Sequence, residues 1–159
     1  MTTNGEKIVN DNDGERKAQN GNDREYQGCL SFYHPNTGGS GAAVQFELKA
    51  AQGRREGCIF MVFGRQKTLA ARNGDGTRQM PTFDWANRIT VKLGFADLCN
   101  LLLVLNGKHE QAGGGRGLFH DTAEANTVIG LRRNAEPSGY LLEVSRKTKQ
   151  QGAEAQRMR

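Results

Sequence analysis

The sequence predicts a β-rich α+β domain with about seven mostly antiparallel strands and one short helix. Three observations lead to this fold class. Apolar and polar residues alternate along several short segments, which is the period of a half-buried strand. Short turns that contain Gly and Pro separate these segments. A single run, FADLCNLLLVLNGK, has its apolar residues at helical spacing instead.

The first half of the chain carries three strand patterns. Residues 29–34 predict a short strand that ends at the turn PNTGGSG. Residues 42–50 alternate strictly, which indicates one face in water and one face in the core. Residues 58–63 are apolar throughout and are expected to form a central strand. The segment 69–80 contains NGDGTR and is expected to be a loop.

The segment PTFDWANRITVK and its continuation predict the most informative strand. Three apolar residues alternate with three polar or cationic ones, in the order Arg88, Ile89, Thr90, Val91, Lys92 and Leu93. Because side chains alternate between the faces of a strand, burial of the apolar set forces the cations to the other face. A half-buried strand with outward cations is suited to contact an anionic partner.

A helix is expected directly after this strand, with Gly107 as its C-cap. Its apolar stripe is wider than packing on one sheet face requires. We therefore expect part of it to form a homo-oligomer interface, through Phe95, Leu98, Leu101, Leu102 and Leu105. Further strands are expected at residues 118–121, 126–133 and 140–145.

The two ends of the chain differ in composition from its centre. Residues 1–27 contain few apolar side chains and predict a disordered arm, because such a segment cannot bury enough surface to offset its ordering entropy. The arm has four basic and six acidic residues, which is a net charge of −2. Because the formal net charge of the whole chain is +5, the remainder carries +7. We expect one domain over residues 28–149 and a polar C-terminal tail over residues 150–159.

Several classes of function have weak support. The pair His120-Asp121 lacks a nucleophile in a sharp glycine-flanked turn, and GGGRG lacks the Lys-Ser/Thr end of a phosphate loop. Cys29, Cys58 and Cys99 have no metal-binding spacing and behave as small apolar residues, which favours a reducing compartment. We expect no enzyme activity, no cofactor and no metal.

The sequence also constrains the cellular location of the protein. No apolar run reaches membrane-spanning length, and the N-terminal segment lacks the core of a signal peptide. We expect a cytoplasmic, nucleoid-associated protein, with an organellar location as the alternative.

Cations and aromatic rings are interleaved along the predicted strands. Single-stranded nucleic acid binds to such surfaces, because cations follow the phosphates and flat rings stack on bases. Trp85 and Phe119 suit the core equally well. The candidate nucleic-acid-binding residues are Tyr33, Arg65, Lys67, Trp85, Arg88, Lys92, Arg132, Arg133 and Arg146.

Three short motifs resemble the Whirly family of single-stranded DNA-binding proteins. They are Phe83-Asp84-Trp85, Phe119-His120-Asp121 and Ser138-Gly139-Tyr140, in the order and approximate spacing of that family. The resemblance implies two curved antiparallel sheets that cross, single-stranded nucleic-acid binding, and helices that mediate dimers or tetramers. Related folds are those of positive cofactor four, Pur-alpha and the kinetoplastid mitochondrial RNA-binding proteins.

The chain departs from the family in two places. The family motif Lys-Gly-Lys-Ala-Ala-Leu aligns with residues 39–44, where glycines replace both lysines. The family also has an eighth strand and a second long helix near its C-terminus. The last residues here offer no apolar pattern for either, so a dimer is as well supported as a tetramer.

Two hypotheses of different kinds therefore remain. The first is a sequence-tolerant binder of single-stranded nucleic acid, DNA favoured over RNA, that acts in DNA transactions or transcription regulation. The second is a structural or interaction subunit of a larger assembly, in which the basic charge is incidental.

Overall fold

The computed structural model describes residues 29–159, so the predicted arm 1–27 lies outside the described residues. The predicted fold class is confirmed, because strands dominate these described residues and they contain a single α-helix. The elements in chain order are β1 (Cys29–His34), β2 (Ala42–Lys49), β3 (Cys58–Gln66), β4 (Ala71–Arg72), β5 (Arg78–Gln79), β6 (Phe83–Leu93), α1 (Phe95–Leu105), the 3-10 turn η1 (Ala112–Gly115), β7 (Leu118–Asp121), β8 (Ala125–Asn134), β9 (Gly139–Thr148) and β10 (Gln156–Met158).

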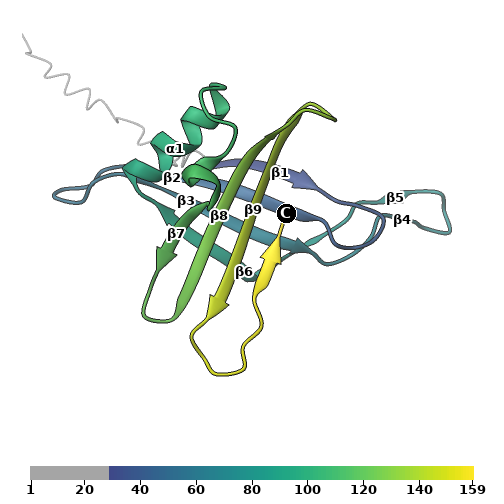
Figure 1. The fold of residues 1–159 in the computed structure, drawn as a ribbon. Coiled ribbons are helices and arrows are strands. Elements are labelled where there is room, and N and C mark those ends of the chain that lie inside the picture. The colour runs from purple at the N-terminus through teal and green to yellow at the C-terminus, as the bar shows by residue number, and fades with distance from the viewer. Residues whose placement is uncertain (1–28) are drawn as a thin grey trace, which may run out of the picture.

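Two four-stranded antiparallel sheets form the body. The first sheet has the strand order β1-β2-β3-β6, and the second sheet has the order β10-β9-β8-β7. The strands of the second sheet run across those of the first, and α1 lies at one end of the crossing (Figure 1). The segment predicted as a loop contains the short hairpin β4–β5, which projects from the body and is exposed.

The core fills the space between the crossed sheets. We call the sheet faces that turn toward it the inner faces, and the opposite faces the outer faces. Alternation along β6 is confirmed, since Ile89, Val91 and Leu93 are buried whereas Arg88, Thr90 and Lys92 are exposed. From the second sheet Leu118, Ile129, Leu131, Val144 and Met158 join the same cluster.

The prediction of a polar C-terminal tail over residues 150–159 is wrong for its last residues. Residues Gln156–Met158 form β10, which pairs with Arg146–Val144 of β9 as an edge strand. Met158 is only 3% exposed and belongs to the core. The expectation that an eighth body strand is missing is therefore wrong as well. A strand of three residues with one apolar anchor gives almost no periodic signal.

The helix packs by one edge of its apolar surface. Leu101 and Val104 are buried against the core, and Leu98 is partly buried there. Leu102 remains 54% exposed and Phe95 84% exposed. The hydroxyl of Tyr140 donates a hydrogen bond of 3.0 Å to the Leu105 carbonyl, which ties the end of α1 to β9.

Leu101 therefore belongs to the core and not to a free interface, whereas Phe95, Leu102 and Leu105 form an exposed apolar stripe. None of the helices in the described part of the chain has the length and apolar content needed to span a lipid bilayer.

Candidate nucleic-acid interface

The outer face of the first sheet carries an open groove of about 430 Å³. The strand register places these side chains on one face. Lys92 pairs with Phe60, and Val62 pairs with both Thr90 and Gln45. Paired residues share a face of the sheet. The groove is lined by Gln45, Glu47, Lys49, Phe60, Val62, Trp85, Arg88 and Thr90.

Trp85 reaches this groove through an irregularity in β6. Ile89 pairs with Phe63, and Asp84 pairs with Arg65. Between these two pairs β6 advances by five residues, whereas β3 advances by only two. Strict alternation would place Trp85 on the inner face with Ile89. The bulge reverses that orientation and re-aims the ring outward, a recognised use of β-bulges.

The Asp84 carboxylate holds the bulge in shape. Its Oδ1 accepts hydrogen bonds from the backbone N–H groups of Ala86, at 3.1 Å, and Asn87, at 3.2 Å. Its Oδ2 accepts one from the Asn87 side-chain amide at 2.8 Å. The hydrogen bonds from Asn87 lower the pKa of Asp84 from its ordinary value, and the nearby Lys67 ammonium contributes in the same direction.

The Trp85 ring lies flat against the backbone of Gly64 on β3. A Cβ atom at Gly64 would sit 2.9 Å from Cε3 of the indole, closer than real Cβ atoms come to their neighbours. Glycine at this position is therefore what gives the ring its place on the sheet.

Aromatic rings continue from Trp85 along one end of the first sheet. The centroid of Phe83 lies 6.4 Å from that of Trp85 and 5.4 Å from that of Tyr33, both with tilted planes. Tyr33 is exposed and Trp85 is partly exposed. The alternative that Trp85 is a core residue is therefore incorrect, and the same holds for Phe119, which is 63% exposed on the second sheet.

Cations flank the groove. Arg88 and Lys92 are exposed on the outer face of β6, and Nη1 of Arg88 donates a hydrogen bond of 3.0 Å to the Trp85 carbonyl. Lys49 of β2 lies on the far side, with its Nζ 3.4 Å from Oε2 of Glu47. The groove thus combines the aromatic side chains of Phe60 and Trp85 with cations on both sides, of which Lys49 is paired with Glu47.

The other predicted cations lie elsewhere. Arg65 is on the inner side beside Ala42, and its Nη2 donates a hydrogen bond of 3.0 Å to the Arg157 carbonyl of β10. Arg65 therefore joins the two sheets and does not line the groove. Lys67 lies beyond the end of β3, close enough to Asp84 to influence its pKa.

The remaining three arginines belong to the second sheet. Arg132 is on its outer face, in a separate hollow. Arg133 alternates to the inner side near Gly107. Arg146 shares that inner side with its pair partner Thr127, and its Nη2 is 4.0 Å from Oε2 of Glu124. These residues do not meet the groove on the first sheet.

Six lining residues were not among the predicted binding residues, namely Gln45, Glu47, Lys49, Phe60, Val62 and Thr90, and neither was Gly64 beneath Trp85. The continuous apolar run of β3 concealed the fact that Phe60 points outward. Its alignment opposite Lys92 could have revealed the shared face, had the strand register been known.

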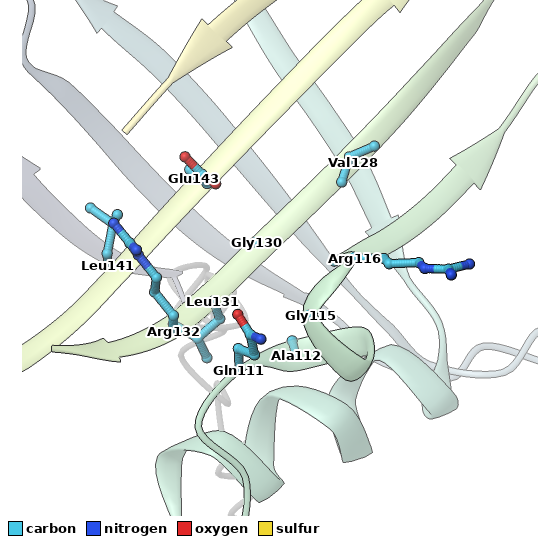
Figure 2. A pocket seen from close by; sticks show the side chains of 11 residues that line it. Gln111, Ala112, Gly115, Arg116, Val128, Gly130, Leu131, Arg132, Leu141 and Glu143 are labelled. Atoms are coloured by element: carbon cyan, nitrogen blue, oxygen red, sulfur yellow. The ribbon is translucent and has the colours of Figure 1, made fainter.

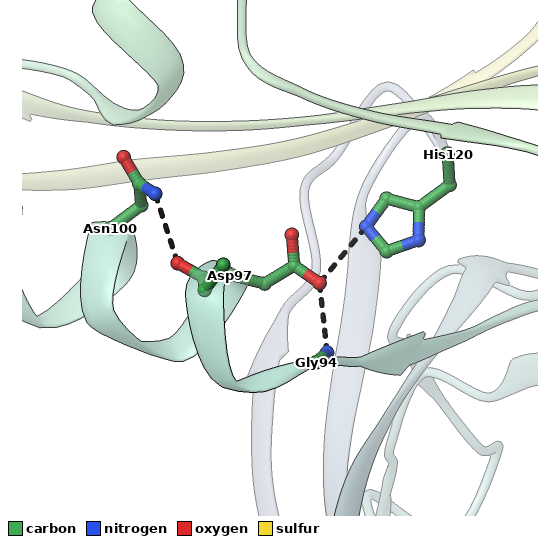
Figure 3. A network of polar contacts seen from close by, with 5 residues as sticks. Gly94, Asp97, Asn100 and His120 are labelled. Atoms are coloured by element: carbon green, nitrogen blue, oxygen red, sulfur yellow. Dashed lines mark hydrogen bonds and ion pairs between the residues drawn. The ribbon is translucent and has the colours of Figure 1, made fainter.

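His120 does not contact Asp121 as an oriented base would require. Its Nε2 lies 3.2 Å from Oδ2 of Asp97, an ion-pair distance without hydrogen-bond geometry (Figure 3). The same Asp97 oxygen accepts a hydrogen bond of 2.8 Å from the Gly94 backbone, so it caps the start of α1. Asp121 pairs instead with Lys149 at 2.7 Å. Residues 29–159 contain no group of three or more side chains arranged to hold a metal.

Comparisons with known proteins inform the fold. No protein-family model and no curated protein sequence matches the chain. The solved structure of the plant transcriptional regulator PBF-2 is similar, with a TM-score of 0.51 and 15% identity, over 83% of this chain and 77% of that chain. At this identity the likeness concerns the fold alone. It agrees with a Whirly-like arrangement of two crossed antiparallel sheets.

Proposed function

We propose that this protein binds single-stranded nucleic acid with little sequence preference, DNA more tightly than RNA. The contact surface is the outer face of the first sheet. The observation that carries the proposal is the placement of Trp85, which a bulge and a glycine hold partly exposed beside the groove. A tryptophan that only filled the core would need neither the bulge nor the glycine.

The groove offers the two interactions that single strands use. Base stacking on an aromatic ring tolerates any sequence, since every base has a π face, and contributes about 1–3 kcal/mol per base. Trp85 supplies such a ring, and Phe60 adds apolar surface beside it. Arg88 and Lys92 stand on the same face, where each can contact a phosphate of the strand.

The sheet also restricts these cations. A side chain on a paired strand starts from a fixed backbone, so it loses less freedom on binding than the same side chain on a loop. Each cation is therefore expected to form a defined phosphate contact. The fold shared with a plant transcriptional regulator supports a role in DNA transactions or transcription regulation.

We also propose a homo-oligomer, a dimer or a tetramer. The exposed stripe on α1, formed by Phe95, Leu102 and Leu105, supports an interface between copies. Assembly would bring several grooves onto one strand, which raises affinity through effective concentration. The proposed location is cytoplasmic and nucleoid-associated, or organellar.

A structural subunit is the second candidate function. Besides the helix stripe, Leu30, Phe32 and Leu48 on β1 and β2 are more than half exposed. Such apolar surface is typical of proteins that bind other proteins. In that case the groove would have no nucleic-acid ligand, and its positive charge would serve solubility.

A competition experiment separates the two functions. A labelled single-stranded DNA is bound to the full chain and displaced with unlabelled single-stranded DNA, single-stranded RNA or duplex DNA of equal length. The proposal requires displacement in the order single-stranded DNA, then RNA, then duplex. Absence of binding to every probe at low salt would favour the structural subunit.

A further inference from the structure

A second hollow, of about 100 Å³, lies on the outer face of the second sheet (Figure 2). It is far smaller than the groove on the first sheet, so only part of a planar ring could enter it. Gly130 of β8 forms its floor. Val128 and Leu141 provide apolar walls, and the loop Gln111–Gly117 forms its rim.

Glycine at position 130 leaves room for the Glu143 side chain at the edge of this hollow. A Cβ atom there would lie 3.0 Å from Cγ and 3.1 Å from Oε1 of Glu143, so the carboxylate lies close against β8. The loop leaves the edge of β8 between the pairs Gln111–Arg132 and Leu118–Ile129, and it takes a left-handed path at Gly115 and Gly117. Residues with side chains rarely adopt that path.

Four polar side chains around the hollow have no hydrogen-bond or ion-pair partner among residues 29–159. They are Gln111, Arg116, Arg132 and Glu143. Glu143 lies on one side of Gly130, with Gln111 and Arg132 on the other, whereas Arg116 points away from the floor. A ring on the floor would therefore meet a carboxylate on one side and an amide on the other.

We propose that this hollow binds a guanine base. An ionised carboxylate only accepts hydrogen bonds, and its two oxygens can accept two parallel ones. Guanine alone among the common bases presents two adjacent donors, N1–H and the N2 amino group, on one edge. Adenine and cytosine place a ring acceptor beside their amino group, and that acceptor would face the Glu143 carboxylate unfavourably.

The remaining groups fit the same ligand. The Gln111 amide can donate to the O6 acceptor of guanine, and apolar walls suit the faces of the ring. Arg132, which lines the hollow, could contact a phosphate attached to the base. The hollow would thus give an otherwise sequence-tolerant binder a preference for guanine at one position. In this respect the inference deepens the proposed function and rests on it.

Nucleotide titrations of the isotope-labelled full chain test the hollow independently of the groove. The probes are guanosine, adenosine, cytidine, uridine and inosine 5′-monophosphates, and the readout is the amide resonance of Gly130. Guanosine monophosphate should bind roughly tenfold more tightly than the adenosine, cytidine and uridine probes, the scale of one bidentate base contact. The inosine probe, which lacks the N2 amino group, should fall in between.

Two variants locate the effect. Glu143→Gln should remove the guanine preference, and Gly130→Ala should reduce binding of all the monophosphates. Glu154→Gln, a change at an exposed glutamate outside the hollow, should leave the titrations unchanged. Equal affinity for the guanosine and adenosine probes, or a preference that survives Glu143→Gln, would overturn the inference.

An oligothymidylate with and without one central guanine separates this inference from the proposed function. Tighter binding of the guanine-containing strand, lost in Glu143→Gln, supports both. Equal binding of the two strands contradicts the guanine site and leaves the groove proposal standing. Failure of both strands to bind, with guanosine monophosphate still bound, contradicts the groove and keeps the guanine site as one for free nucleotides.

Discussion

The indole of Trp85 rests on the backbone of Gly64, with only 2.9 Å available between its Cε3 atom and any Cβ atom at that position. The two residues lie on neighbouring strands, β6 and β3, and meet because a bulge turns Trp85 outward. This contact sets the position of the only tryptophan in the chain. It therefore offers a direct optical test of the architecture.

Gly64→Ala should displace the Trp85 ring. The added methyl group cannot fit without movement of the indole, and such overpacking costs about 1–3 kcal/mol of stability. Tryptophan emission should shift, and affinity for single-stranded DNA should fall. Gly74→Ala is the matched control, because a Cβ atom there meets nothing within 4 Å. An unchanged spectrum for Gly64→Ala would show that the ring does not occupy this place.

Acidification should loosen the bulge in β6, because it protonates the Asp84 carboxylate. The pKa of this carboxyl is lowered from 3.8 in the folded protein. Its charged form is therefore favoured by folding, and the associated stability is present above the unfolded pKa and lost as pH falls through the folded value. Trp85 fluorescence should titrate in this acidic range.

Asp84→Asn should abolish that titration. Asp75→Asn is its control, since the pKa of Asp75 is also lowered, by Thr77, but in the distal hairpin between β4 and β5. A fluorescence transition that follows Asp75 instead, or that persists without Asp84, would contradict the role of Asp84 in positioning the ring.

Leu102→Asp should dissociate the oligomer without unfolding the protomer. Leu102 is half exposed on α1, so the new carboxylate remains hydrated in the monomer but would be buried in an interface. Leu101→Asp, one residue away but buried, should unfold the chain instead. Sedimentation equilibrium and circular dichroism distinguish these results. A wild-type protein that is monomeric at micromolar concentration would contradict the interface.

Met158→Ala should destabilise the protein by about 2–5 kcal/mol, as expected for a buried methionine truncated in a core. Denaturant unfolding measures the change. The neighbouring Arg159→Ala, at an exposed position, should have almost no effect. If Met158→Ala unfolds at the wild-type midpoint, the last strand does not contribute to the core.

Alternation explains what could be predicted from the sequence. Ile89, Val91 and Leu93 were assigned correctly to the core, because a period of two leaves no other choice where one face is buried. The helix was equally clear from its spacing. Both patterns depend only on local geometry.

The positions of three other residues depend on long-range register instead. Trp85 changes face at a bulge that involves the partner strand β3, and Phe60 lies in a strand whose two faces are both apolar. Arg65 reaches β10, whose three residues gave no signal of their own. Only the pairing of strands distant in sequence fixes these positions.

The salt dependence of binding tests the central claim most directly. Affinity of a single-stranded DNA for the wild type, Arg88→Ala, Lys92→Ala, the double variant and Arg65→Ala is measured over a range of salt concentrations. Each groove substitution should weaken binding by about 0.5–1.5 kcal/mol, the scale of an exposed charged contact. Each should also flatten the slope of log affinity against log salt by roughly 0.7. Arg65→Ala, which removes a cation from the inner side, should leave the slope unchanged. A double variant that binds like the wild type at every salt concentration would show that nucleic acid does not contact the outer face of the first sheet.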